Sequence, residues 1–390
     1  MVESAKMPSA IVKYIHFLPY LIGGFVWSLL VTPLMGRLAK RFKFVDQPPS
    51  SRQRADATRE RRWHRIPVAK MGGVVILLPL LLSPLLFGVE KWLVSFVISV
   101  SALIILGILD DKFEISGKWQ FLALIGISIF AVSGGIVITD IQNPFDTFLN
   151  LNILPLNIKL FGQNFTVYPL ALIISTLWLI IVSNAINWID NIGGIAAAIT
   201  FITGVAIFLV AVRNGDSIQA GVAALLLGTI GGFLPFNVIP EKIFIGGTAI
   251  AVGFTIGALS IVEKTKISTW LIVLGLPIAD FVFVLISRIK QYKPNSFRKF
   301  IEMLGTSGKE HLAFRLYDGG LDKKQVLFVE LLLSGIFSII GLALSGLWTT
   351  VGIFTMCGIM VIVYLFTKYL IKSKVKKEDK DATPEQKFAY

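Results

Sequence analysis

Long uncharged stretches of apolar residues recur along the chain and restrict the folds that it can adopt. A helix of about 20 apolar residues crosses the roughly 30 Å hydrocarbon core of a bilayer. The mean hydropathy of +0.75 and the charged fraction of 16% are far from those of soluble domains. We therefore predict an all-α, polytopic membrane protein with about eleven transmembrane helices, at residues 14–36, 68–88, 92–109, 119–139, 167–183, 193–212, 217–237, 244–262, 268–288, 325–345 and 348–370.

Positive charge is concentrated in particular loops and predicts the orientation of the chain. The loop 36–70 holds eleven Lys and Arg against three acids, and residues 287–324 and the C-terminal tail are also rich in Lys and Arg. By contrast, residues 140–168 contain one Lys and no Arg. The positive-inside rule then places the basic segments in the cytoplasm, the N-terminus outside and the C-terminus inside. We expect no nucleic-acid partner, because the basic residues flank apolar stretches and do not form a soluble domain.

The same patterns predict the domain organisation. Residues 1–371 form a single transmembrane domain, and residues 372–390 form a charged tail that we expect to be disordered. The outer loop 140–168 contains "NIKLFGQNFTVY", which predicts a short β-hairpin with its turn at Gln163 and Asn164. With eleven crossings, the loops after the first, third, fifth, seventh and ninth helices all lie on the cytoplasmic side. These loops carry most of the unusual polar residues, so we predict a site on that face.

Two adjacent carboxylates, Asp110 and Asp111, end the third apolar stretch in "LGILDDKF". Like charges at a membrane boundary are costly unless a cation joins them. The alternative is an ordinary solvated helix end, where Lys112 and Lys118 balance the charge.

The stretch "NAINWIDNIGG" ends the fifth apolar segment and places Asn184, Asn187 and Asp190 at intervals of three. On a helix they share one face, and their oxygen atoms are the ligands that Mg²⁺ prefers. Capping of the next helix by Asp190 or Asn191 is the alternative, but capping does not explain Asn184 and Asn187.

Three further groups of polar residues remain open between a site role and a structural one. His311 and Arg315 are four residues apart in "HLAFRL" and could bind phosphate, or the segment could be an amphipathic surface helix. His64 and Lys70 precede a Gly-Gly pair that could bind phosphate or allow close helix packing. Asp280 is a carboxylate inside an apolar stretch. It could belong to a site, or it could pair with a Lys or Arg of another helix.

Taken in order, these motifs resemble those of the polyprenyl-phosphate N-acetylhexosamine-1-phosphate transferases (glycosyl transferase family 4), from about residue 31 to residue 344. The quoted segments are the basic first loop ending in "KMGG", "LGILDD", "NAINWID", "GGFLPFNVIPEKIFIG", "VLGLPIADFVFVLISR" and "HLAFRL". Each motif is weak alone, and the ordered set is specific.

The resemblance implies a Mg-dependent phosphoglycosyltransferase of the bacterial cytoplasmic membrane. Such an enzyme transfers a sugar phosphate, here N-acetylglucosamine-1-phosphate, from a UDP-sugar to undecaprenyl or another polyprenyl phosphate, releases UMP and serves envelope polysaccharide synthesis. Mn²⁺ is an alternative to Mg²⁺, and the partners are both substrates, membrane lipids and, as a further option, a second copy in a homodimer. The implied residues are Asp110, Asp111, Asp190 and His311 for catalysis, Lys70, Asn184, Arg315 and His64 for substrate binding, and Asn187, Asp190 and Asp111 for the metal.

The chain departs from the family pattern at three places. Gly193 stands where the pattern D-G-x-D-G has its second Asp, and Gly247 stands where F-M-G-D has its Asp. Ala313 and Phe314 stand where the family has further histidines. Two other hypotheses therefore remain beside the transferase: a non-catalytic relative that binds polyprenyl phosphate or a partner, and a transporter. The transporter is disfavoured because the chain shows no internal repeat and its polar residues gather at one end of the helices.

Overall fold

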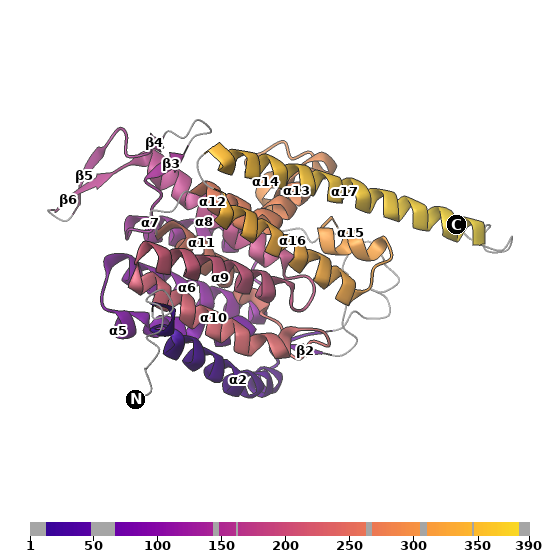
Figure 1. Ribbon diagram of the computed structural model, residues 1–390, viewed down its shortest axis with the longest axis horizontal. Coiled ribbons are helices and arrows are strands. Elements are labelled where there is room, and N and C mark those ends of the chain that lie inside the picture. Colours follow the sequence, from indigo (N-terminus) through magenta and orange to yellow (C-terminus); the bar gives the residue numbers. More distant parts are fainter. Residues whose placement is uncertain are drawn as a thin grey trace, which may run out of the picture.

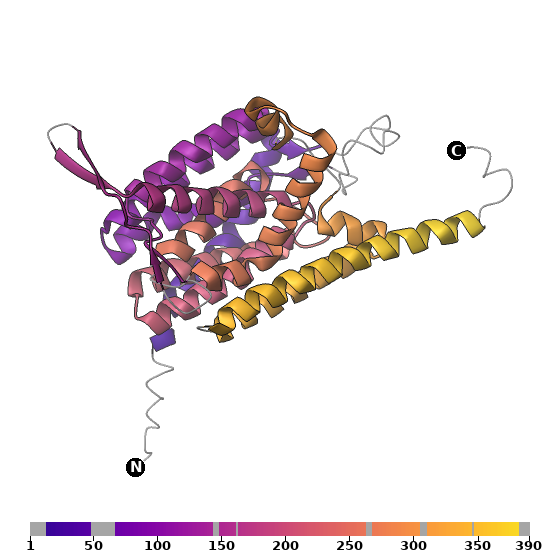
Figure 2. The same ribbon diagram turned by 90° about the horizontal axis from the view of Figure 1, so that it is seen from above.

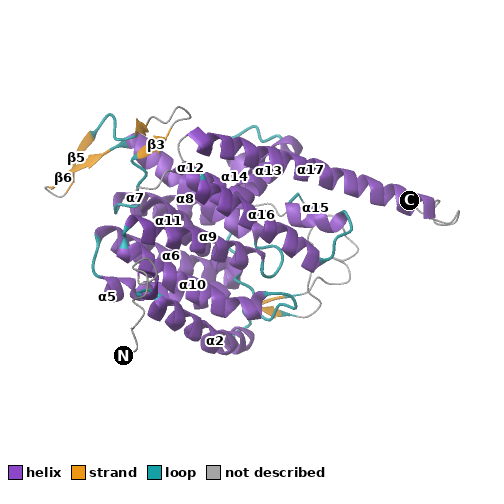
Figure 3. Cartoon of the chain, in the orientation of Figure 1, coloured by secondary structure: helices purple, strands orange, loops and turns teal. Residues whose placement is uncertain are grey.

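The structure is a computed structural model, and it describes residues 13–47, 67–142, 148–160, 163–262, 267–304, 310–344 and 347–381. Helices dominate the fold (Figure 3). The α-helices are α2 (Leu18–Arg41), α4 (Gly72–Leu77), α5 (Ser83–Phe87), α6 (Lys91–Phe113), α7 (Gly117–Ser133), α8 (Pro169–Ile189), α9 (Ile195–Asn214), α10 (Ser217–Asn237), α11 (Ala249–Val262), α12 (Ile267–Val273), α13 (Gly275–Tyr292), α14 (Phe297–Leu304), α15 (Leu312–Asp318), α16 (Lys323–Ala343) and α17 (Leu347–Asp381). Two short 3₁₀ segments, η1 (Leu78–Leu82) and η2 (Gly246–Thr248), complete the helical part.

The apolar stretches of the sequence all coincide with helices in the described part of the chain. Seven helices are long and apolar enough to cross a membrane, and the pair α12–α13 adds an eighth if it counts as one span. Residues 72–87, 117–133 and 246–262 form shorter apolar helices. The predicted all-α, polytopic membrane fold is therefore confirmed, while the number of crossings and the sides of the termini stay predictions.

Strands occur only as short antiparallel pairs among the described residues. They are β1 (Val45–Asp46) with β2 (Val68–Ala69), β3 (Asp140–Gln142) with β4 (Phe148–Asn150), and β5 (Leu156–Leu160) with β6 (Gln163–Val167). The last pair confirms the predicted hairpin but not its turn. Gln163 and Asn164, the expected turn residues, belong to β6, because they pair with Leu160 and Lys159.

The ninth apolar stretch, predicted as one helix, is two helices that meet at a bend of 78°. The break lies at Leu274, three residues before Pro277. Proline has no backbone N–H, so the carbonyl group of Val273 loses its partner in the following turn. The bend brings Asp280 of α13 into the interior of the bundle, where its side chain is buried.

The last helix is longer than the sequence predicted. Residues 372–381, which we expected to be disordered, continue α17, and residues 382–390 lie outside the described part. This segment reads "KSKVKKEDKD" and consists mostly of residues that tolerate or favour the helix. Figure 2 shows α17 running past the end of the bundle.

The two ends of the bundle carry different structures. The pairs β3–β4 and β5–β6 lie at one end, and β2, α15 and the far end of α17 lie at the other (Figure 1). Residues from loops distant in the sequence meet at the end that carries β2. This grouping agrees with the expected gathering of polar loops on one face.

Helices α2 and α10 pack closely because α10 contains Gly228 and Gly232, four residues apart. A β-carbon on Gly228 would lie 2.1 Å from the carbonyl oxygen of Leu21, and one on Gly232 would lie 2.3 Å from that of Phe25. Small residues at this spacing allow helix backbones to approach in membranes.

We expect Gly228→Ala to lower the free energy of unfolding by about 1–3 kcal/mol, the usual cost of overpacking. The measurement is thermal unfolding of the purified protein in detergent, followed by tryptophan fluorescence. Gly36→Ala, in the partner helix α2, is the matched control, because no atom lies within 4 Å of a β-carbon placed on Gly36. Equal melting temperatures for the two variants would contradict the close contact.

Candidate functional site

One pocket of about 280 Å³ collects polar residues from four separate parts of the chain. They come from the β1–β2 region, the end of α6, the end of α8 and the segment between α10 and η2. The lining residues are Asp46, Lys70, Asp110, Asp111, Asn187, Asp190, Asn191, Ile192, Gly193, Glu241, Phe244, Gly246 and Gly247.

Backbone hydrogen bonds hold the Lys70 segment in place. The Lys70 N–H donates to the Phe44 carbonyl group at 3.0 Å, beside the β1–β2 pair. On its other side, Gly72 N–H donates to the Phe244 carbonyl group at 2.8 Å, and Phe244 N–H donates to that of Ala69 at 2.8 Å. Lys70 is therefore fixed between the first loop and the segment before η2.

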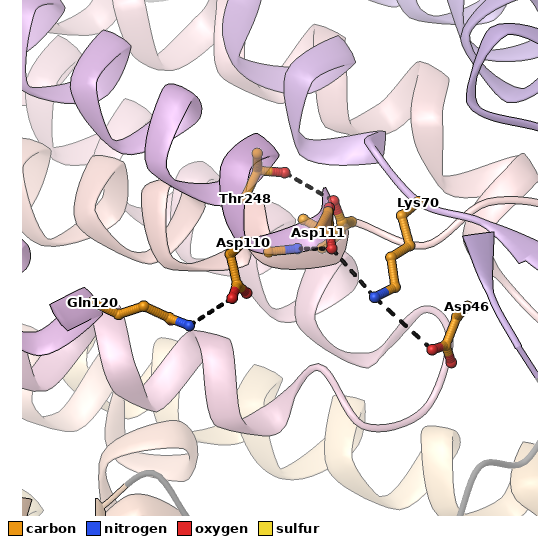
Figure 4. Close-up of polar contacts among 8 residues, drawn as sticks. Asp46, Lys70, Asp110, Asp111, Gln120 and Thr248 are labelled. Carbon is orange, nitrogen blue, oxygen red and sulfur yellow. Dashed lines mark hydrogen bonds and ion pairs between the residues drawn. The ribbon is translucent and has the colours of Figure 1, made fainter. Parts of the chain in front are cut away.

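Asp111 is an enclosed carboxylate of this pocket, with a side chain 3% exposed. Its Oδ1 accepts the backbone N–H of Gly247 at 3.0 Å and lies 3.3 Å from Lys70 Nζ (Figure 4). Lys70 Nζ also lies 3.9 Å from Asp46. Asp111 Oδ2 is buried and has no hydrogen-bond partner in the described structure. A buried carboxylate oxygen without a partner is costly, so it is suited to accept a cation or a proton from a ligand.

Asp110 has different partners from its neighbour. Its Oδ1 accepts a hydrogen bond from Gln120 Nε2 of α7 at 2.7 Å, as Figure 4 shows. Of the two lysines in the alternative of a solvated helix end, Lys112 donates to the Phe42 carbonyl group at 3.1 Å and Lys118 Nζ lies 5.6 Å from the centre of the Trp119 ring. The two carboxylates thus present separate oxygens to one pocket.

Asn187 and Asp190 at the end of α8 complete the acidic side of the pocket. Burial, together with the charge of Asp111, raises the pKa of Asp190 to about 7. A bound cation would favour the charged form of this carboxyl group. Asn184 lies elsewhere: its Nδ2 donates to the Ile180 carbonyl group of its own helix at 2.8 Å.

Capping does not account for the polar residues after α8. The N-cap of α9 is Gly194, whose N–H donates to Asn237 Oδ1 at 3.0 Å. Asp190 is instead the C-cap residue that directly follows α8. The sequence alternative in which Asp190 or Asn191 caps the next helix is therefore not observed.

The oxygen atoms of the pocket suit a divalent cation that binds together with a phosphate ligand. Among the described residues no three His, Cys, Asp or Glu side chains form a cluster that could hold a metal ion by themselves. Mg²⁺ commonly keeps several waters and takes one or two carboxylates together with substrate phosphates. The unpartnered Asp111 Oδ2 and the oxygens of Asp190 and Asn187 fit a cation that arrives with a pyrophosphate.

Gly247 has no space for the acidic side chain that the family pattern has there. A β-carbon on this residue would lie 2.6 Å from the Gly107 carbonyl oxygen. Its backbone N–H instead donates to Asp111. The close contact of η2 with α6 therefore requires glycine and gives Asp111 a donor in place of a second carboxylate.

His311 and Arg315 lie outside this pocket, in a buried network with Asp280 and α17. Asp280 accepts hydrogen bonds from Tyr364 Oη at 2.6 Å and from Leu312 N–H at 2.7 Å, and its Oδ2 lies 2.6 Å from His311 Nδ1. Asp280 is thus paired with a histidine and a tyrosine, and not with a Lys or Arg as one sequence hypothesis had it.

Arg315 contacts α17. Its Nε donates to Thr367 Oγ1 at 2.9 Å and its guanidinium group lies 5.0 Å from the centre of the Phe283 ring. Leu312, Phe314 and Leu316 are buried, so α15 is not a surface helix. The nearest link to the pocket is Trp188, next to Asn187, whose ring centre lies 6.3 Å from that of His311.

The sequence-predicted residues thus divide into three groups. The pocket brings together Lys70, Asp110, Asp111, Asn187 and Asp190. Asn184, His311 and Arg315 are not among its lining residues, and His64 lies outside the described part of the chain. Sequence reasoning missed Asp46, Gln120 and Glu241. Of these, Glu241 carried a signal, since it is a charged residue between two apolar stretches on the side predicted to hold the site.

Comparison with known protein families covers the central part of the chain. Residues 93–264 match the family described as glycosyl transferase family 4, a segment that contains the Asp110–Asp111 pair, Asn187, Asp190 and Glu241. It does not contain His311 or Arg315.

Several bacterial proteins are similar along most of their length. A Bacillus subtilis (strain 168) protein named "Probable undecaprenyl-phosphate N-acetylglucosaminyl 1-phosphate transferase" is 28% identical over 359 residues, covering 89% of this chain and 91% of the relative. A phospho-N-acetylmuramoyl-pentapeptide-transferase of Shouchella clausii is 27% identical over 355 residues, with 85% and 97% covered. That of Clostridium beijerinckii is 26% identical over 297 residues, with 72% and 83% covered. The match over residues 93–264, these relatives and the helical membrane fold together support the resemblance of the chain to glycosyl transferase family 4.

Proposed function

We propose that this chain transfers N-acetylhexosamine-1-phosphate, with N-acetylglucosamine as the sugar, from a UDP-sugar to undecaprenyl or another polyprenyl phosphate. The reaction would take place at the cytoplasmic face of a bacterial cytoplasmic membrane and release UMP. One observation carries the proposal: Asp110, Asp111, Lys70, Asn187 and Asp190 meet in a single pocket at one end of the helical bundle. The relatives named above act on undecaprenyl phosphate or are phosphosugar transferases by name.

In the proposed reaction, an oxygen of the lipid phosphate attacks the sugar-bearing phosphorus of the UDP-sugar. The bond between that phosphorus and the bridging oxygen to UMP breaks, and the lipid-linked sugar pyrophosphate forms. Several negative charges meet in this step, so the barrier is largely electrostatic. A divalent cation, Mg²⁺ or Mn²⁺, would neutralise the pyrophosphate.

The residues of the pocket divide this work by their contacts. Lys70 Nζ, 3.3 Å from Asp111, can turn toward a phosphate oxygen when a ligand enters. Asp110 and Asp111 would receive the proton of the lipid phosphate, and Asp111 Oδ2 has no partner that competes for this role. Asn187 and Asp190 supply oxygen ligands on the nucleotide side.

The test uses membranes that contain the protein, radiolabelled UDP-N-acetylglucosamine, undecaprenyl phosphate and Mg²⁺. We expect chloroform-soluble label that depends on the lipid phosphate and on the cation. A panel of other UDP-sugars identifies the donor if this one fails. If no donor gives lipid-soluble label while a known transferase works alongside, the proposed activity is wrong.

A second candidate function is a non-catalytic relative that binds polyprenyl phosphate or a partner. It is favoured by the lack of a three-residue metal cluster among the described residues and by Gly247, which excludes an acidic side chain. Binding of undecaprenyl phosphate without any transfer would support it. Transfer that is lost in Asp111→Asn would exclude it.

A further inference from the structure

Glu241 is a pocket residue to which no motif in the sequence assigns a role. It lies between the end of α10 and η2, and its side chain is 8% exposed. It lines the same pocket as Asp110, Asp111 and Asp190. Its carboxylate is therefore an enclosed acidic group that faces the proposed reaction site.

Gly193 and Glu241 occupy adjoining space. A β-carbon on Gly193 would lie 2.0 Å from Cγ of Glu241 and 2.9 Å from Cδ, the carboxyl carbon. The same β-carbon would lie 2.7 Å from the Asn237 carbonyl oxygen, so residue 193 has no room for a side chain beside Glu241. Glu241 fills the volume of the side chain that residue 193 does not have.

The partners of Glu241 leave its carboxylate able to bind a ligand. Lys323 Nζ, at the start of α16, lies 3.9 Å from Glu241 Oε1. That distance is too long for a hydrogen bond, and Lys323 is 24% exposed, so the attraction is weakened by solvent. Lys323 is not a lining residue of the pocket.

We propose that Glu241 supplies the carboxylate absent at Gly193 and holds the divalent cation on the Asp190 side of the pocket, directly or through one of the cation's waters. This role deepens the proposed transferase function and rests on it for the identity of the substrate. The acidic group has moved from one loop to another that meets it in space. Loss of the Asp at position 193 then does not remove negative charge from the site.

The test measures binding of Mn²⁺ to the purified full-length protein by electron paramagnetic resonance, with the ion alone and with added UDP. We expect Glu241→Gln, which keeps the size of the side chain, to weaken Mn²⁺ binding by about tenfold, the lower end of the effect of losing a group that supports a metal. Unchanged Mn²⁺ affinity in Glu241→Gln, or no Mn²⁺ binding by the unaltered protein in either condition, would overturn the proposal.

Lys323→Met separates a ligand role from a structural one. If Glu241 only anchors α16 through Lys323, both variants should lower Mn²⁺ affinity and thermal stability alike, which would overturn the proposal. If Glu241 holds the cation, removing the competing ammonium group should leave Mn²⁺ affinity equal or higher. Glu302→Gln, on the exposed helix α14, should match the unaltered protein.

Transfer assays on the same preparations distinguish this inference from the proposed function. Mn²⁺ binding that depends on Glu241, without lipid-linked product, would sustain the inference and refute the transferase. Product formation together with unchanged Mn²⁺ binding in Glu241→Gln would support the transferase and refute the role of Glu241.

Discussion

Asp111→Asn is expected to lower the rate of sugar-phosphate transfer by about 10²–10⁴-fold, the usual contribution of a group that accepts a proton in the reaction. The substitution removes the negative charge from a side chain that is 3% exposed and lies 3.3 Å from Lys70 Nζ. Asparagine keeps a carbonyl oxygen that can accept the Gly247 N–H, now at 3.0 Å from Oδ1. The fold should therefore persist while the chemistry is lost.

The measurement is kcat and KM for formation of the lipid-linked sugar. A loss in kcat at similar KM for the UDP-sugar would indicate a role in the transition state. Asp140→Asn is the matched control: it makes the same chemical change on an exposed residue of β3, at the other end of the bundle. Asp111→Asn activity within threefold of the control would show that Asp111 is not part of the machinery.

Asp280→Ala is expected to lower the free energy of unfolding by about 3–5 kcal/mol, because each buried polar group left without a partner costs about 1–3 kcal/mol. Asp280 is 2% exposed and joins three partners: His311, the backbone N–H of Leu312, and Tyr364. These partners link α13 to the start of α15 and to α17. Without the carboxylate, several buried polar groups lose their partner at once.

Thermal unfolding in detergent measures this effect. Glu302→Ala is the control, because its ion pair with Arg298 is exposed, with side chains 56% and 85% accessible, and such pairs contribute about 0–1 kcal/mol. Asp280→Asn should be milder, since an amide oxygen can still accept from Tyr364 and Leu312. If Asp280→Ala melted at the temperature of the Glu302→Ala control, the network would not be structural.

The parts of the fold that the sequence predicted well are those that depend on one segment at a time. The apolar stretches became helices because nothing else satisfies backbone polar groups within a bilayer. The hairpin of 156–167 formed from local pairing. The bend before Pro277 and the helical residues 372–381 were missed, although the proline and the helix-favouring composition were visible in the sequence.

Part of the pocket was also predictable from single segments. Polar residues at the ends of apolar stretches are costly without a ligand, so such residues are recognisable in the sequence. Examples are the pair Asp110 and Asp111 and the pair Asn187 and Asp190. The spacing of His311 and Arg315 suggested a phosphate-binding role, but neither residue lines the pocket. His311 contacts Asp280, and Arg315 contacts Thr367 of α17. Asn184 shares a helical face with Asn187, but its amide donates to its own helix.

The sequence by itself determined the class of fold, the helices, and the loops whose carboxylates indicate a site. Hydropathy and residue spacing determine these features, and both are properties of a single segment. Only the tertiary structure decided which of these side chains meet. The hydrogen bond from Gly247 to Asp111 joins residues that no local pattern connects. The same holds for Glu241 and the place that a side chain at residue 193 would occupy. Their proximity follows from how the helices pack, and close packing depends on the shape of all the surrounding side chains at once.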